Sequence, residues 1–120
     1  MNDEVLDLDI LRPKAKWVKL GQNKIDVSFI PCGITFEVDG IVRDMATLNP
    51  EKVQEGGEET KRGFDLALKL CATFCGWKNP EMTEDWFRDN TDPAQINKLS
   101  ETIQATLQRS YEGVEAYQKN

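Results

Sequence analysis

Apolar residues return every three or four positions through most of the chain, the spacing that places them on one face of a helix. The longest such run, residues 93–117, carries Ile96, Leu99, Ile103, Leu107, Tyr111 and Val114. Asp92, Pro93 and Gln95 at its start suit an N-cap, a first-turn proline and a capping-box partner. The pattern therefore predicts a long amphipathic C-terminal helix.

Three further segments also have helical spacing. Residues 60–75 carry an apolar stripe broad enough for a central helix contacted on more than one side, and Gly76 is expected to end it as a left-handed C′ residue. Residues 50–55 and 84–90 each follow a good N-cap, an asparagine and a threonine respectively. The polar residues 55–59, with two glycines, are expected to form an exposed, mobile loop.

Residues 34–48 fit two patterns. Residues 34–38 alternate between apolar and polar, and Asp39-Gly40 is a typical hairpin turn. The same segment also has six apolar residues on one helical face: Ile34, Val38, Ile41, Val42, Met45 and Leu48. Because the alternation fails after Gly40, we favour a helix over residues 35–48, with Thr35 as its cap.

The N-terminal part has a period of two instead. Apolar runs at residues 16–20 and 25–30 flank Gly21-Gln22-Asn23, which suits a hairpin turn. Alternation in the second run predicts that Ile25, Val27 and Phe29 face one side and the polar residues between them face the other. A lone hairpin is marginal in water, so this one must lie on helices or pair with another chain.

The patterns together predict an α+β fold that is mostly α. A single domain of residues 1–120 would hold a β-hairpin at about 15–30 and a bundle of four to five helices in residues 34–120, at about 35–48, 50–55, 60–75, 84–90 and 93–117. Residues 1–13 form an acidic, partly flexible lead. Its five aliphatic residues predict that part of it packs on something.

Charge narrows the class of partner. The 120 residues carry a net charge of −6, which disfavours nucleic-acid binding. Residues 1–10 hold four acids and no base, whereas residues 11–25 hold five bases and no acid. These are either two solvated faces or a docking patch for an acidic partner. No signal peptide or membrane-spanning run is expected, so the predicted location is the cytoplasm, with reduced thiols.

Side chains that carry chemistry are few. The chain has no histidine, which removes the commonest general base and metal ligand. Cys71 and Cys75 lie four residues apart on one predicted helix face, but packing as buried apolar groups is favoured over a metal or redox site. Acids near Glu84 and Asp92 are explained as helix caps. We therefore predict no catalytic, cofactor or metal site.

Aromatic residues are the remaining candidates for function. Trp77, Trp86, Phe87 and Tyr111 are the predicted partner-binding residues, because tryptophan and tyrosine are enriched in binding hot spots. For Trp86, packing in the chain's own core is favoured over contact with a partner. The same two alternatives apply to the apolar face of the last helix: it packs in the chain's own core, or it docks in a partner's groove.

One stretch resembles a known family. It reads Pro80-Glu81-Met82-Thr83-Glu84-Asp85-Trp86-Phe87, continues through Asn90-Thr91-Asp92, and reaches Ile96-Asn97-Lys98-Leu99. This stretch is similar to the tail assembly chaperones of long-tailed phages and prophages, small acidic proteins with a Trp-Phe or Trp-Leu helix and a capped C-terminal helix. The hairpin ending at Phe29-Ile30-Pro31 and the helix from Phe64 to Cys75 are also similar to such proteins, so the resemblance covers residues 15–117.

The resemblance implies a role without catalysis. Such chaperones bind the tape-measure protein, keep its long helices from aggregating and help to recruit tail-tube subunits. It also implies a cytoplasmic protein that is absent from the mature virion, and it leaves homo-oligomerisation open. Two other classes remain as alternatives: a structural phage component, such as a head-tail connector or tail subunit, and a small enzyme using the cysteines.

Overall fold

The computed structural model describes the backbone of residues 4–118 and the side chains of residues 4–112. A two-stranded hairpin, β1 (Trp17–Leu20) and β2 (Asn23–Asp26), precedes five helices. The helices are α1 (Thr35–Ala46), α2 (Pro50–Val53), α3 (Glu58–Gly76), α4 (Glu84–Asn90) and α5 (Pro93–Gln118). Short 3₁₀ turns occupy Leu8–Leu11 and Cys32–Ile34. The predicted α+β, mostly α fold is confirmed.

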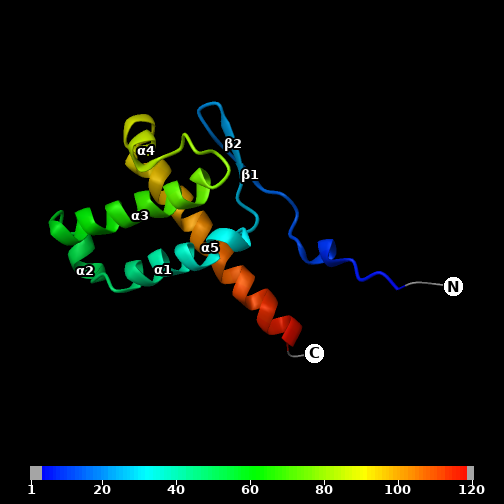
Figure 1. The fold of residues 1–120 in the computed structure, drawn as a ribbon. Coiled ribbons are helices and arrows are strands. Elements are labelled where there is room, and N and C mark those ends of the chain that lie inside the picture. Colours follow the sequence, from blue (N-terminus) through cyan, green and yellow to red (C-terminus); the bar gives the residue numbers. More distant parts are fainter. Residues whose placement is uncertain (1–3, 119–120) are drawn as a thin grey trace.

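Helix α3 is the centre of the helical part. It contacts α1, α2, α4 and α5, and α1 runs alongside it while α5 crosses both (Figure 1). Its buried residues, which include Leu68, Leu70 and Cys71, face several neighbours at once. This explains why its apolar stripe is broader than that of an ordinary surface helix, and the predicted central position is confirmed.

The hairpin turns at Gly21 and Gln22. Gly21 has a φ of +60° and Gln22 does not have a positive φ, the pattern of a turn with glycine at its first central position. Leu20 and Ile25 point inward to the core. The two-residue loop is shorter than the three residues predicted, because Asn23 already pairs with Leu20 in the ladder.

The second strand ends sooner than the alternation predicts. It stops at Asp26, whose carboxylate accepts hydrogen bonds from the backbone N–H groups of Ser28 (2.9 Å) and Lys16 (3.2 Å). This side-chain turn breaks the period of two, so Ser28 is buried and Phe29 only half-buried. Partial burial raises the pKa of Asp26, but hydrogen bonding from Ser28 and Lys16, together with the nearby Arg12 charge, outweighs it and the pKa lies below its ordinary value. The carboxylate therefore stabilises the hairpin end above that ordinary pKa, and acidification removes its contribution.

Helix α1 confirms the helical prediction for residues 35–48, although it ends at Ala46. Val38 and Ile41 are buried as the helical face requires. The prediction that Thr35 caps the helix is wrong. Thr35 is the first helical residue, and its hydroxyl instead donates to the carbonyl of Pro31 at 3.0 Å, because a 3₁₀ turn leads directly into the helix.

Helix α3 differs from its prediction at both ends. Glu58 and Glu59 are helical and form its acidic first turn, so the exposed loop predicted at 55–59 is shorter. Gly76 is the last helical residue and has no positive φ, so its predicted role as a left-handed C′ residue is wrong. The glycine has a packing role instead. A Cβ atom there would lie 3.3 Å from the backbone carbonyl oxygen of Met82.

The caps of the last two helices form as predicted. The Thr83 hydroxyl accepts from the N–H of Trp86, and Asp92 and Gln95 exchange reciprocal side-chain to backbone bonds of 2.8 and 2.9 Å. On α5 the residues of the predicted stripe up to Leu107 are buried. The predicted stripe residue Val114 lies outside the side chains that the structure describes.

Helix α5 also bonds to the segment that follows β2, residues 27–29, which we call the hairpin exit. The Thr106 hydroxyl donates to the Val27 carbonyl oxygen at 2.7 Å, and the Arg109 guanidinium donates to the Ser28 carbonyl oxygen. Val27 and Thr106 are both buried. The lone hairpin thus gains the helical support that its marginal stability requires.

The described part of the N-terminal lead contacts the rest of the chain through Arg12, which lies over the Phe29 ring, and not through its aliphatic residues. Its five aliphatic side chains are all exposed: Val5, Leu6, Leu8, Ile10 and Leu11. The prediction that part of this lead packs is therefore not met within one copy of the chain. Among the described residues, no helix has both the length and the apolar character needed to cross a bilayer.

Candidate partner-binding surface

Trp86 and Phe87 pack against each other at the start of α4. Their ring centroids are 5.1 Å apart and their planes meet at 87°, an edge-to-face contact. Phe87 is fully buried, whereas Trp86 is half-buried and packs on the core from outside. Phe87 is thus a core residue that a partner does not reach in this conformation. Trp86 offers a partner only part of its indole.

Tyr111 is tied to another helix rather than free. Its hydroxyl donates to Asp39 of α1 at 2.6 Å, and Arg43 bonds the other oxygen of the same carboxylate at 2.7 Å. The hydrogen bond raises the pKa of Tyr111, while the bonds from Tyr111 and Arg43 lower the pKa of Asp39. The phenol ring is 41% exposed, so one face remains open to solvent.

Trp77 follows the end of α3 and lies on the backbone of Gly33. A Cβ atom at Gly33 would come within 2.6 Å of two ring carbons of Trp77, so only glycine lets the indole approach this closely. The indole is nevertheless 52% exposed. Next to it in sequence, Lys78 reaches over the Phe29 ring, with its amino nitrogen 5.4 Å from the ring centroid. These contacts join α3, the 3₁₀ turn and the hairpin exit into one surface.

Two exposed aromatic residues were not among the predicted partner contacts. Phe36, in the first turn of α1, is 89% exposed, and Trp17, on β1, is 59% exposed. A helical plot of residues 35–48 leaves Phe36 off the apolar face, and this was the available signal for its exposure. Trp17 carried no such signal, because both faces of a short edge strand can hold an aromatic residue.

We call Gly33, Phe36 and Trp77 the aromatic surface. Phe36 lies in the first turn of α1, which follows the 3₁₀ turn containing Gly33, and Trp77 lies on that same glycine. Exposed large aromatic side chains are typical of binding hot spots. Of the four predicted partner-binding residues, Trp77 alone belongs to this surface, while Trp86 with Phe87 and Tyr111 occupy separate places on α4 and α5.

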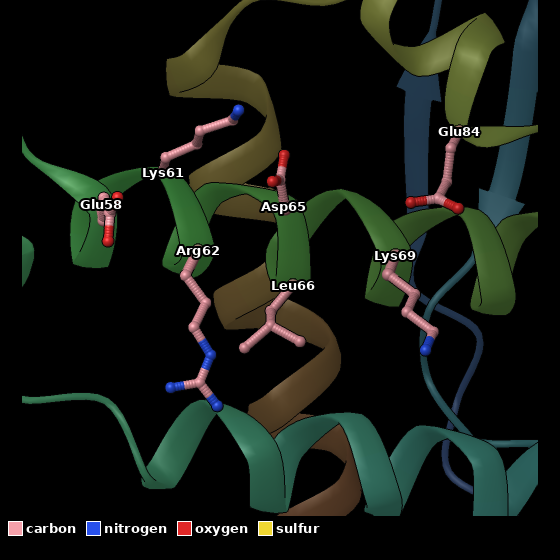
Figure 2. Close-up of a pocket in the computed structure, with 7 residues that line it drawn as sticks. All are labelled: Glu58, Lys61, Arg62, Asp65, Leu66, Lys69 and Glu84. Carbon is pink, nitrogen blue, oxygen red and sulfur yellow. The ribbon is translucent and has the colours of Figure 1, made fainter.

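The open groove along α3 is a different kind of feature. It has a volume of about 460 Å³ and is lined by Glu58, Lys61, Arg62, Asp65, Leu66, Lys69 and Glu84 (Figure 2). Figure 2 shows Lys61 and Asp65 on one side of α3, with Arg62 and Leu66 on the side toward α1. Arg62 is occupied there by a bond to the Thr47 hydroxyl. The three acids and three bases that line the groove balance in charge, so the groove does not concentrate charge of either sign.

The two helical cysteines are buried thiols. Cys71 and Cys75 lie in the core on α3, as predicted, whereas Cys32 is exposed. Burial raises the pKa of Cys71 and raises the pKa of Cys75 to about 12, so neither forms a thiolate near neutral pH. Within residues 4–112, no group of three or more acidic or cysteine side chains is placed to hold a metal ion.

Thiol titration provides the first testable prediction. In native protein we expect a thiol reagent to modify Cys32 rapidly and the two core cysteines only on unfolding. In denaturant all three thiols should react rapidly. The C32S variant should lack the rapid phase that native wild type shows. Rapid native reaction of Cys71 or Cys75 would contradict the buried, protonated state and favour a reactive-thiol enzyme.

Comparison with known proteins adds no family assignment. No protein-family model, curated protein or solved structure matches the chain.

Proposed function

We propose that this protein is a non-catalytic tail assembly chaperone of a long-tailed phage or prophage. Its client is the tape-measure protein, with tail-tube subunits as further partners, and it works in the host cytoplasm. The aromatic surface binds apolar faces of the client's helices and keeps those helices from aggregating. The sequence resemblance is the support for the client, and the exposed Trp77 ring is the support for the proposed place of contact.

The observation that carries this proposal is the exposed indole of Trp77 lying on Gly33. The ring is half-exposed and lies on a bare backbone, and an aromatic side chain with two rotatable bonds costs little conformational entropy to bind. Phe36 nearby in sequence adds a second exposed ring. Apolar helices shed water against such rings without needing a specific polar pattern, which suits a client with long helices.

Co-expression with the tape-measure protein encoded beside this chain is the direct test. The wild-type chaperone is expected to raise the soluble fraction of the tape-measure protein and to be recovered with it in a pull-down. No gain in solubility together with no recovered complex would overturn the proposal. Mass spectrometry of purified virions addresses the structural alternative, because a connector or tail subunit persists in the particle whereas a chaperone does not.

Substitutions on the aromatic surface provide the second testable prediction. W77A is expected to weaken client binding by about tenfold, corresponding to a hot-spot contribution of about 1.4 kcal/mol. G33A should weaken binding as well, because its methyl group displaces the Trp77 ring. The ring is half-exposed and can move, so the fold is expected to persist. The displacement should appear as a change in tryptophan fluorescence.

The matched control is W17A. Trp17 is exposed to a similar degree but lies on the outer face of the hairpin. W17A is therefore expected to leave client binding unchanged. Equal losses for W17A and W77A would mean that exposed indoles bind the client nonspecifically. An unchanged affinity in both W77A and G33A would place the client elsewhere.

A further inference from the structure

The N-terminal arm, residues 4–11, is an exposed apolar segment with acidic side chains between its aliphatic ones. Val5 is 86% exposed and Ile10 76%, and no aliphatic side chain of the arm is less than 59% exposed. Glu4, Asp7 and Asp9 supply three negative charges with no base. Aliphatic residues this exposed in one short segment are typical of a segment that is covered by a partner.

The arm is directed away from its own body. Residues 12–16, which follow it, are all exposed. Arg12 lies over the Phe29 ring, 4.0 Å from its centroid, and this contact holds the place where the arm leaves the hairpin exit. From there the arm runs outward, away from both the hairpin and the helices (Figure 1). Reaching its own hairpin would require the chain to reverse within this linker.

The outer face of the hairpin has the opposite charge. We call Trp17, Lys19 and Lys24 the hairpin face. Lys19 and Lys24 are directly paired across the strands, and the Lys24 amino nitrogen lies 5.4 Å from the Trp17 ring centroid, so the three share one side of the sheet. All three are exposed. The acid nearest in register, Asp26 opposite Trp17, already accepts two backbone N–H groups.

We propose that two copies of this chain associate by exchanging arms, each arm lying on the hairpin face of the other copy. The acids of the arm meet Lys19 and Lys24, and the aliphatic side chains cover Trp17. The two complementary surfaces belong to the same chain, so a two-fold pairing satisfies both at once. The aliphatic side chains of both arms, all exposed in a single copy, are partly covered in this dimer. The exchange goes beyond client binding and does not depend on the identity of the client.

Sedimentation velocity of the full chain over a wide range of concentration tests the association. Wild type is expected to convert from monomer to dimer as concentration rises, and high salt should weaken the dimer because the charged contacts are exposed. Replacing Leu8 and Ile10 by Ser should raise the dissociation constant by about tenfold or more. Both residues are exposed in a single copy, so circular dichroism and thermal unfolding should be unchanged at concentrations where wild type is monomeric.

Charge exchange then separates exchange between copies from folding back within one copy. An arm variant, D7K/D9K, and a hairpin variant, K19E/K24E, should each fail to self-associate. Mixed together they should form a one-to-one dimer, since the basic arm finds an acidic hairpin face and the acidic arm finds a basic one. Folding back within one copy gives no such rescue.

Several results would overturn the exchange. These are a wild-type chain that stays monomeric at every concentration, a dimer unaffected by either charge variant, and variants that do not pair on mixing. A hairpin face that binds an oligonucleotide while the chain stays monomeric would also overturn it. W77A is the control that separates the two proposals, because it is expected to lose client binding and keep the dimer.

Discussion

F87A is expected to lower the free energy of unfolding by about 3–5 kcal/mol, the usual loss when a buried phenylalanine is truncated. The Phe87 side chain is fully buried and makes the edge-to-face contact with Trp86. Its removal leaves a cavity and also takes away that aromatic pairing. Because a domain of this size is stable by only about 5–15 kcal/mol, this is a large share of the total.

Urea denaturation of F87A and of two controls measures this loss. F87L keeps most of the volume and is expected to cost less than the truncation. W86A removes a half-buried ring that packs on the core from outside, so its loss should also be smaller than that of F87A. A midpoint of F87A equal to that of wild type, at equal denaturant dependence, would show that Phe87 is not a core anchor.

The outcome matters for interpreting any binding experiment on this pair. If F87A loses client binding, the cause can be unfolding rather than a lost contact. Binding must therefore be measured under conditions in which F87A is still folded. Truncating the half-exposed Trp77 ring removes less buried area than truncating Phe87, so W77A is less prone to this confusion. This difference is the reason that the client experiment uses Trp77 and Gly33 rather than the Trp-Phe pair.

Sequence patterns predicted which segments are helices and which form the hairpin, because periodicity follows directly from which side of an element meets the core. They also predicted the caps at Thr83 and Asp92, where a short polar side chain bonds its own helix end. Such interactions are local. They need no knowledge of what lies across the fold.

The errors concern contacts that the periodic pattern of each element does not show. Gly76 has the sequence context of a helix C-cap, but it is glycine because the Met82 carbonyl approaches it. The hairpin's second strand stops early because Asp26 bonds Lys16, ten residues before it. Likewise, nothing in the spacing of Trp86 and Phe87 shows which ring enters the core. That choice depends on which side of α4 meets α3.

The candidate surface was predicted only at Trp77. Its value as a contact depends on Gly33, forty-four positions earlier, and no local pattern links the two. The arm shows a different failure. Its aliphatic content predicted packing, but the single chain offers it no groove. The predicted packing of the arm therefore occurs only if a second copy of the chain covers it, as in the proposed dimer.

T106V is expected to destabilise the protein by about 1–3 kcal/mol, the cost of leaving a buried carbonyl without its donor. The Thr106 hydroxyl bonds the Val27 carbonyl oxygen at 2.7 Å, and valine keeps the shape of the side chain but cannot donate. The loss should fall mainly on the hairpin's attachment. Amide hydrogen exchange should therefore speed up at Ile25 and Val27 more than in the centre of α3.

The matched control is S110A on the same helix. Ser110 also bonds a carbonyl oxygen, that of Thr106 within its own helix, but it is exposed and so its removal is expected to change stability by about 0.5 kcal/mol or less. Equal losses of stability in the two variants would mean that the hydrogen bond from Thr106 to Val27 stabilises the protein no more than a bond within one helix does. If T106V does loosen the hairpin, it should also weaken arm exchange while sparing Trp77-dependent client binding. The hairpin would then be the element that couples the fold to self-association.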